Sequence, residues 1–152
     1  MPVGPTNRSS WAPDLVIALA PVLLGGSLYL FWRPANLLMF DAIRALGMAQ
    51  HLDLARTVVQ HWAPLGPGFV RDSLPTGLWA FSLVYCIEWI WRHSGSEPLR
   101  FAHVAIGMAI AVAVEALQLV GLPGTFDLLD LAANLAGAAL AEGVAYVRNA
   151  QV

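Results

Sequence analysis

Two short polar patterns flank a glycine- and proline-containing break near the C-terminal end of an otherwise apolar chain. Before the break, Glu115 and Gln118 are three residues apart; after it, Asp127, Asp130 and Asn134 follow at intervals of three and four residues. Residues at these spacings share one face of an α-helix. Their carboxyl and amide groups can therefore form a ligand-binding cluster, an acid–base pair, or hydrogen bonds that only hold two helices together.

The two patterns lie at matched depths if the segments around the break form an antiparallel hairpin. Glu115 and Asp130 are equally far from the middle of the break. Two carboxylates at one depth repel each other unless a cation lies between them. Arg71 and Asp72 precede another apolar run, and chain direction places them at the same end, so the cation could be Arg71, a ligand's ammonium group or a metal ion. The predicted polar cluster comprises Glu115, Gln118, Asp127, Asp130, Asn134, Arg71 and Asp72.

The composition indicates which solvent surrounds these helices. Of the 152 residues, 58% are hydrophobic and only 12% are charged, about half the charged share of a soluble domain. One soluble core cannot hide so much apolar surface, so we expect lipid around the chain. A net charge of -2 at pH 7 gives no reason to expect nucleic acid as a partner.

Four apolar runs are long enough to cross a bilayer, which takes about 20 helical residues. They cover residues 15–32, 74–91, 101–122 and 126–147. A backbone in lipid must satisfy its own hydrogen bonds, so each run is expected to be a helix. We therefore predict a single all-α membrane domain over residues 1–152, an integral membrane bundle of about four transmembrane helices.

The arginines do not fix the orientation of this bundle, because they divide equally between its two ends. The short segments at the end that holds both termini favour a cytoplasmic position for that end. We interpret the first run as a retained anchor rather than a signal peptide. The predicted location is the cytoplasmic (inner) membrane of a bacterium, with both termini cytoplasmic.

The segment between the first two runs, residues 36–62, is too often interrupted by charge to cross a membrane. In its second half, the polar side of the helix holds Asp53, Arg56, Thr57, Gln60 and His61, and the opposite side holds Leu54, Val58 and Trp62. We expect an amphipathic helix that lies flat in the headgroup region or caps the bundle.

Small residues recur every four positions along the last run, at Ala133, Gly137 and Ala141. Such a stripe lets a neighbouring helix approach closely, either inside the bundle or from a partner protein. We predict that these three residues pack helices. The sequence contains no recognisable metal-binding, phosphate-binding or hydrolase motif, so we predict no metal ligand and no catalytic residue, and the cofactor remains unknown.

The spacing of polar residues around the break resembles the signature of the VanZ-like family, which consists of small polytopic membrane proteins of bacteria. The resemblance covers residues 115–137, with the pattern Glu115-x-x-Gln118, a short break, and then Asp127-x-x-Asp130-x-x-x-Asn134-x-x-Gly137. The founding member of that family is associated with resistance to the glycopeptide teicoplanin.

The resemblance implies a non-enzymatic protein of the bacterial cell envelope, with glycopeptide resistance as one role that it allows. Its polar cluster would bind a lipid headgroup or an envelope intermediate. Two alternatives stay open. One is an accessory or structural subunit of a larger membrane complex, with other membrane subunits as partners. The other is an intramembrane hydrolase or transferase that uses Glu115 and Asp130 as acid and base.

Overall fold

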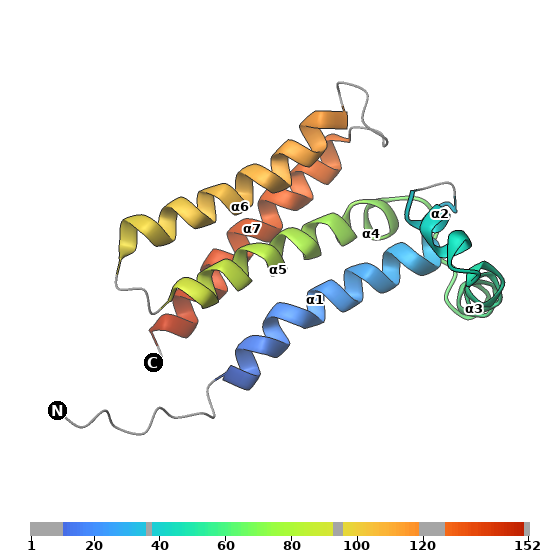
Figure 1. Ribbon diagram of the computed structural model, residues 1–152, viewed down its shortest axis with the longest axis horizontal. Helices are drawn as coiled ribbons and strands as arrows, with labels where there is room; N and C mark the ends of the chain where they lie inside the picture. The colour runs from blue at the N-terminus through green and yellow to red at the C-terminus, as the bar shows by residue number, and fades with distance from the viewer. Residues whose placement is uncertain (1–10, 36–37, 93–95, 119–126, 151–152) are drawn as a thin grey trace.

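The fold is all-α throughout the described residues, which are 11–35, 38–92, 96–118 and 127–150 of a computed structural model (Figure 1). No strand occurs in these ranges, so the predicted fold class is confirmed at that level. The helices are α1 (Trp11–Trp32), α2 (Leu38–Ala45), α3 (Ala49–Trp62), α4 (Phe69–Asp72), α5 (Leu74–Trp91), α6 (Glu97–Gln118) and α7 (Leu128–Asn149).

Four long helices, α1, α5, α6 and α7, correspond to the four apolar runs. The predicted range 74–91 coincides with α5, whereas α6 begins four residues before the predicted range 101–122, whose end lies outside the described residues. The difference arises because helix ends follow capping chemistry: Glu97 and Pro98 are favourable in a first turn, although neither is apolar. Among the described helices, α1 and α7 are long and apolar enough to cross a membrane by length and composition.

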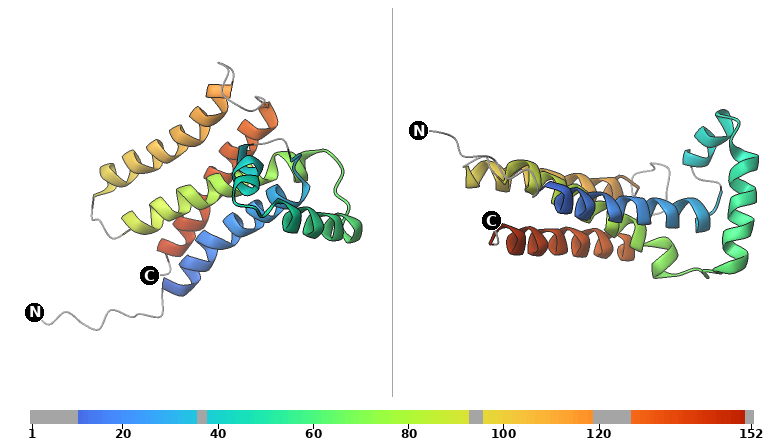
Figure 2. Two further views of the ribbon diagram at one scale, coloured as in Figure 1. Left: turned by 45° about the vertical axis from the view of Figure 1, so that its right-hand side comes forward. Right: turned by 90° about the horizontal axis from the view of Figure 1, so that it is seen from below.

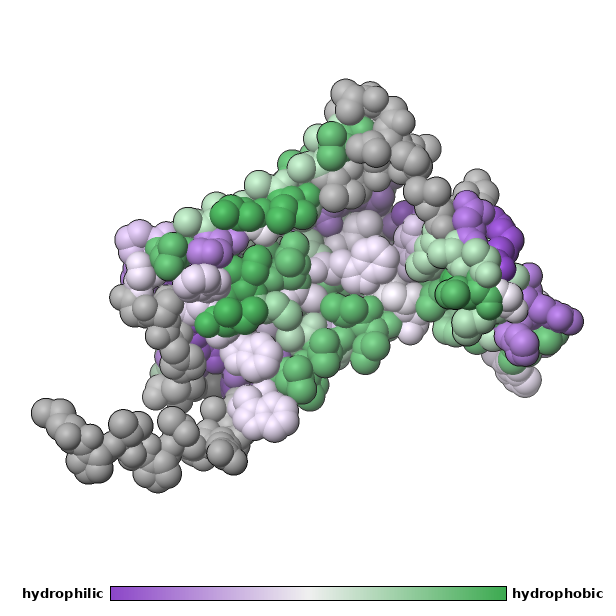
Figure 3. Space-filling model, viewed as in Figure 1, coloured by the Kyte–Doolittle hydropathy of each residue, from purple (hydrophilic) through white to green (hydrophobic). Residues whose placement is uncertain are grey.

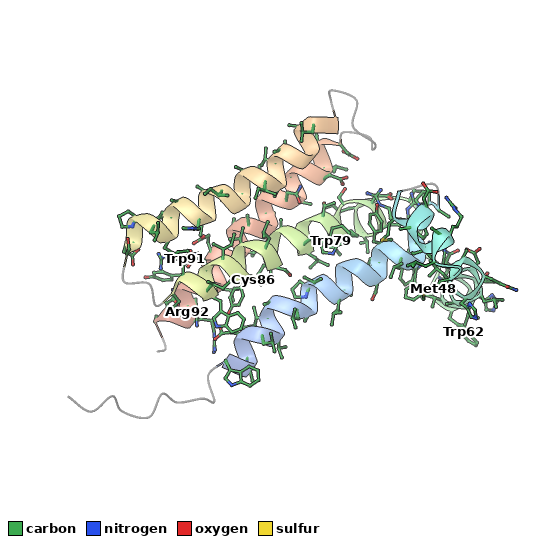
Figure 4. All side chains as sticks on the ribbon, viewed as in Figure 1. Met48, Trp62, Trp79, Cys86, Trp91 and Arg92 are labelled. Carbon is green, nitrogen blue, oxygen red and sulfur yellow. The ribbon has the colours of Figure 1, made fainter. Side chains whose placement is uncertain are left out.

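The central helix is α5, which contacts α1, α6 and α7 (Figures 1 and 2). On its α1 side, Gly25 makes room for Trp79, because a Cβ added at Gly25 would lie 2.9 Å from the indole Nε1 (Figure 4). The buried core along α5 consists mainly of small side chains, together with Val84 and Tyr85. Small core residues bring the helix axes close together.

The closest approach of α5 and α7 involves two glycines. A Cβ added at Gly137 would lie 2.0 Å from the carbonyl oxygen of Gly77, and one added at Gly77 would lie 2.8 Å from the carbonyl oxygen of Ala133. Ala133 and Ala141 are also buried. The structure therefore places the three predicted helix-packing residues in contact regions inside the chain, where α5 occupies the stripe that a partner helix would otherwise use.

Many large apolar side chains lie on the surface while several charged and amide side chains are buried, and we refer to this distribution as reversed polarity. Large apolar side chains are exposed on every long helix, and Figure 3 shows them along the surface of the bundle; examples are Leu23, Ile90, Ile106 and Leu140. Asp14, Glu88, Asp130 and Asn134 are buried instead. In soluble proteins, charged residues are almost never fully buried unless they are paired.

The predicted interfacial segment, residues 36–62, contains α2 and α3, and α3 runs across one end of the bundle (Figure 2). Arg56 Nη2 donates a hydrogen bond to the carbonyl oxygen of Arg33 at 2.6 Å, and Gln60 donates to the carbonyl of Phe31. The carbonyl of Phe31 lies in the last turn of α1 and that of Arg33 directly after it, where intrahelical partners run out. Arg56 and Gln60 therefore cap α1, while Leu54 and Val58 remain exposed.

Candidate functional site

Arg33, directly after α1, joins two carboxylates from different parts of the chain. Its Nη1 lies 3.4 Å from Oδ1 of Asp72, and its Nη2 lies 3.8 Å from Oδ2 of Asp130. Asp72 ends α4 and Asp130 lies in the first turn of α7. The guanidinium group therefore ties the end of α1 to the starts of α5 and α7, and it separates two carboxylates that would otherwise repel each other.

Asp72 is held by three partners. Arg71 donates from Nε at 2.9 Å and from Nη2 at 3.1 Å, and the backbone N–H of Gly68 donates at 2.9 Å. Burial alone would raise the pKa of Asp72, but these hydrogen bonds and the charge of Arg33 outweigh it, so the pKa lies below its ordinary value. Asp72 is therefore a stable anion at neutral pH.

Asp130 is the most deeply buried charged member of this group, with 6% of the residue exposed. The hydroxyl group of Ser73, which is also buried, donates a hydrogen bond to its carboxyl group. Two atoms of the Arg33–Asp130 pair, Arg33 Nε and Asp130 Oδ1, are buried without a hydrogen-bond partner. One is a donor and the other an acceptor, so a polar ligand could satisfy both. We refer to Arg33, Arg71, Asp72, Ser73 and Asp130 as the Arg33 cluster.

The structure brings together three members of the predicted polar cluster: Arg71, Asp72 and Asp130. Asn134 lies one turn further along α7, where its Nδ2 donates a hydrogen bond to the carbonyl oxygen of Ala111 on α6 at 3.4 Å. This bond joins the two C-terminal helices, which is the helix-holding role considered above. The side chains of Glu115 and Gln118 lie outside the described residues.

Asp127 has a different position from the rest of the predicted cluster. It is the N-cap of α7, and its Oδ1 accepts a hydrogen bond from the backbone N–H of Leu129 at 2.8 Å. Asp127 is exposed. Its charge is used to stabilise the positive end of the helix.

The cation between Asp72 and Asp130 is Arg33, which the predicted cluster did not include; the predicted pair of Glu115 and Asp130 stays a prediction, because the side chain of Glu115 lies outside the described residues. Arg71 contacts the carboxylate of Asp72, its neighbour in sequence, and Arg33 contacts both carboxylates. A signal for Arg33 was present in the sequence, because it follows the first apolar run and chain direction places it at this end of the bundle. What the sequence lacked was a way to choose between the two arginines.

A second ionic cluster lies at the opposite end of the bundle and was missed entirely. Asp14, in the first turn of α1, is 2% exposed; it lies 3.2 Å from Arg92 and 3.4 Å from Arg148 and accepts a hydrogen bond from Tyr85. Figure 4 shows Arg92 at the end of α5, beside the start of α1. This Asp14 cluster fastens α1 to α5 and α7.

A further buried carboxylate, Glu88, lies near this end. Glu88 on α5 lies 3.7 Å from Arg100 on α6, and that arginine also pairs with the exposed Glu97 at 3.1 Å. Within the described ranges, no group of three or more His, Cys, Asp or Glu side chains is placed to hold a metal ion. The chemistry supported by the described residues is hydrogen bonding and ion pairing with a polar group.

Comparisons with protein-family models, with curated proteins and with solved structures give no match for this chain.

Proposed function

We propose that this chain is an integral protein of the bacterial cytoplasmic membrane and that all four long helices cross the bilayer. The main support is the reversed polarity of the fold. Leu23 on α1 and Leu140 on α7 are 69% and 64% exposed, whereas Asp14 and Glu88 are each 2% exposed. Lipid favours this arrangement, since it solvates the leucines and forces charged groups to find partners inside the protein.

The spacing of the ionic clusters also supports a membrane-spanning bundle. Both clusters include a residue of α7, Asp130 at one end and Arg148 at the other. Eighteen residues of helical rise separate them by about 27 Å. This length is close to the roughly 30 Å of hydrocarbon in a bilayer, so the clusters would lie near its two boundaries, with α3 along one of them.

We further propose that the protein is non-enzymatic and that the Arg33 cluster binds a lipid headgroup or an envelope intermediate. The observation behind this proposal is the pair of buried, unpartnered atoms, Arg33 Nε and Asp130 Oδ1. A buried polar group without a hydrogen bond costs about 1–3 kcal/mol. A ligand that offers an acceptor to the first atom and a donor to the second would recover much of that cost.

The resemblance of residues 115–137 to the VanZ-like signature supports placing this function in the cell envelope. Teicoplanin susceptibility of cells with and without the chain is therefore a suitable phenotype to measure. The alternative of an accessory subunit loses the small-residue stripe as a docking face, because α5 already packs against it.

The test is whether purified protein retains lipid through Arg33. Native mass spectrometry after extraction from bacterial membranes should detect bound lipid on the wild type and much less on Arg33→Gln. The matched control is Arg44→Gln, because Arg44 pairs with Asp41 on the surface at the same end of the chain. A folded Arg33→Gln protein that retains as much lipid as Arg44→Gln would exclude the site.

Folding of the variant needs its own control, since Arg33→Gln leaves two carboxylates without their shared cation. The double variant Arg33→Gln with Asp130→Asn removes one charge of each sign and keeps similar side-chain volumes. We expect its circular dichroism spectrum to match that of the wild type while its bound lipid is lost. A double variant that folds and keeps the lipid would also exclude the site.

A further inference from the structure

We infer that the ligand of the Arg33 cluster is a phosphoethanolamine-type zwitterion, in which a phosphate group carries a primary ammonium group on a short linker. This inference rests on the proposed headgroup-binding function and specifies its ligand. It depends on the charge balance of the cluster, on the kinds of atom left unpartnered, and on the part of the cluster that reaches the surface.

The charges within the cluster cancel. Arg33 and Arg71 supply two positive charges, and Asp72 and Asp130 supply two negative charges, all linked by contacts of 3.8 Å or less. Asp127, the next carboxylate along α7, is exposed and bonded to the N–H of Leu129. A headgroup with a net charge would unbalance these half-buried ion pairs, whereas a zwitterion would preserve their neutrality.

The unpartnered atoms specify the two ends of the zwitterion. Arg33 Nε is a donor without an acceptor, and guanidinium groups bind phosphate oxygens with well-matched geometry. Asp130 Oδ1 is an acceptor without a donor, and a primary ammonium offers three N–H bonds. The quaternary nitrogen of choline has no N–H, so a phosphocholine group would leave Asp130 Oδ1 unsatisfied.

Exposure gives the direction in which such a headgroup would enter. The side chains of Arg33, Arg71 and Asp72 are 21%, 23% and 24% exposed, while that of Asp130 is 9% exposed. The two arginines and Asp72 therefore form the outer part of the cluster and Asp130 the inner part. The phosphate would remain at the arginines, near the bilayer boundary, and the ammonium would point inward to Asp130.

The experiment measures lipid selectivity by native mass spectrometry of the full chain from nanodiscs that contain equal amounts of phosphatidylethanolamine, phosphatidylcholine and phosphatidylglycerol. We expect the wild type to prefer phosphatidylethanolamine over phosphatidylcholine by about tenfold, which corresponds to the free energy of one hydrogen bond to a charged group. Asp130→Asn gives the cluster a net positive charge and should shift the preference to phosphatidylglycerol. The control Asp41→Asn, which changes an exposed carboxylate at the same end, should leave the selectivity unchanged.

A second arm distinguishes a membrane lipid from a soluble compound with the same headgroup. Added glycerophosphoethanolamine, whose phosphodiester keeps the headgroup electrically neutral, should fail to displace the bound lipid if the acyl chains contribute to binding, and it should displace the lipid if the headgroup alone is the ligand. This arm separates the two sources of the headgroup, and the preference for phosphatidylethanolamine over phosphatidylcholine in the first arm decides whether the ligand is the zwitterion.

The outcomes against this inference are separate from those against the proposed function. One such outcome is that Arg33→Gln loses the lipid, but the wild type binds phosphatidylcholine or phosphatidylglycerol as readily as phosphatidylethanolamine. This outcome would overturn the inferred zwitterionic ligand and leave headgroup binding in place. An unchanged selectivity in Asp130→Asn would overturn it as well. Lipid binding that does not depend on Arg33 would overturn the proposed function itself.

Discussion

Replacing Gly137 with alanine tests the close packing of α5 against α7. The new Cβ would lie 2.0 Å from the carbonyl oxygen of Gly77 and 2.9 Å from its carbonyl carbon. Both contacts are with backbone, which cannot rotate away as a side chain would. A contact of at least about 3 Å requires the two helices to separate locally by about 1 Å, and overpacking of this kind costs about 1–3 kcal/mol.

The matched control is Gly143→Ala in the same helix. An alanine Cβ at Gly143 meets nothing within 4 Å, so this variant should only gain the higher helix propensity of alanine, up to about 1 kcal/mol. Because both variants share that gain, the difference between them isolates the steric effect. We therefore expect Gly137→Ala to be less stable than Gly143→Ala by about 1–3 kcal/mol.

The assay is thermal unfolding of the purified proteins in the same detergent, followed by circular dichroism and by tryptophan fluorescence. At roughly 2–4 °C for each kcal/mol in a chain of this size, Gly137→Ala should melt some 2–12 °C below Gly143→Ala. A melting temperature of Gly137→Ala at or above that of Gly143→Ala would mean that the two helices are not in backbone contact at Gly77.

Two further predictions concern the ionic clusters. Tyr85→Phe removes a hydrogen bond to the buried carboxylate of Asp14 and should lower the free energy of unfolding by about 1.5–3 kcal/mol. The control is Tyr146→Phe, at a residue that is 77% exposed, and it should change the free energy of unfolding by less than about 0.5 kcal/mol. Equal effects of the two variants in chemical unfolding would contradict the Asp14 cluster. The pKa of Asp72 is depressed in the folded state, so its stabilisation is present above its unfolded pKa of about 3.9 and is lost as the pH falls through the folded value. The stability advantage of the wild type over Asp72→Asn should therefore be full at pH 7 and shrink below about pH 4, and an advantage that does not change with pH would refute the ion pairs of Asp72.

The long helices could be predicted from the sequence because hydrophobic length and helix length nearly coincide in a membrane-like chain. The predicted range of α5 matched its observed bounds, and the start of α6 differed because Glu97 and Pro98 extend the helix beyond the apolar run. The small-residue stripe was also visible, since its period of four residues places Ala133, Gly137 and Ala141 on one face of α7.

The ionic partners could not be predicted, because side-chain pairing depends on contacts between distant parts of the chain. Asp14 lies 78 residues from Arg92 and 134 residues from Arg148. On the sequence alone it was one acid near the start of an apolar run. Arg33 and Arg71 were equivalent by chain direction, and only the turn formed by α4 directs Arg71 to its neighbour Asp72.

The helical periodicity of α3 also did not show which of its polar residues contact the rest of the protein. The sequence grouped Asp53, Arg56 and Gln60 together. In the structure, Arg56 and Gln60 bond to the end of α1, whereas Asp53 is exposed. A helical repeat defines a face, but the position of the neighbouring helix decides which of its residues are buried.

The reversal of polarity is tested most directly by measuring what surrounds the exposed leucines and isoleucines. Cys86 is the only cysteine in the chain, so single spin labels can be introduced at Leu23, Leu83, Ile106 and Leu140 in a Cys86→Ala background. In lipid nanodiscs we expect all four labels to be relaxed strongly by oxygen, which dissolves in hydrocarbon, and weakly by a water-soluble nickel complex, with the opposite result for a label at Asp53. Labels on the four long helices that are relaxed mainly by the nickel complex would show that water covers these surfaces, and they would contradict a bundle that crosses the membrane.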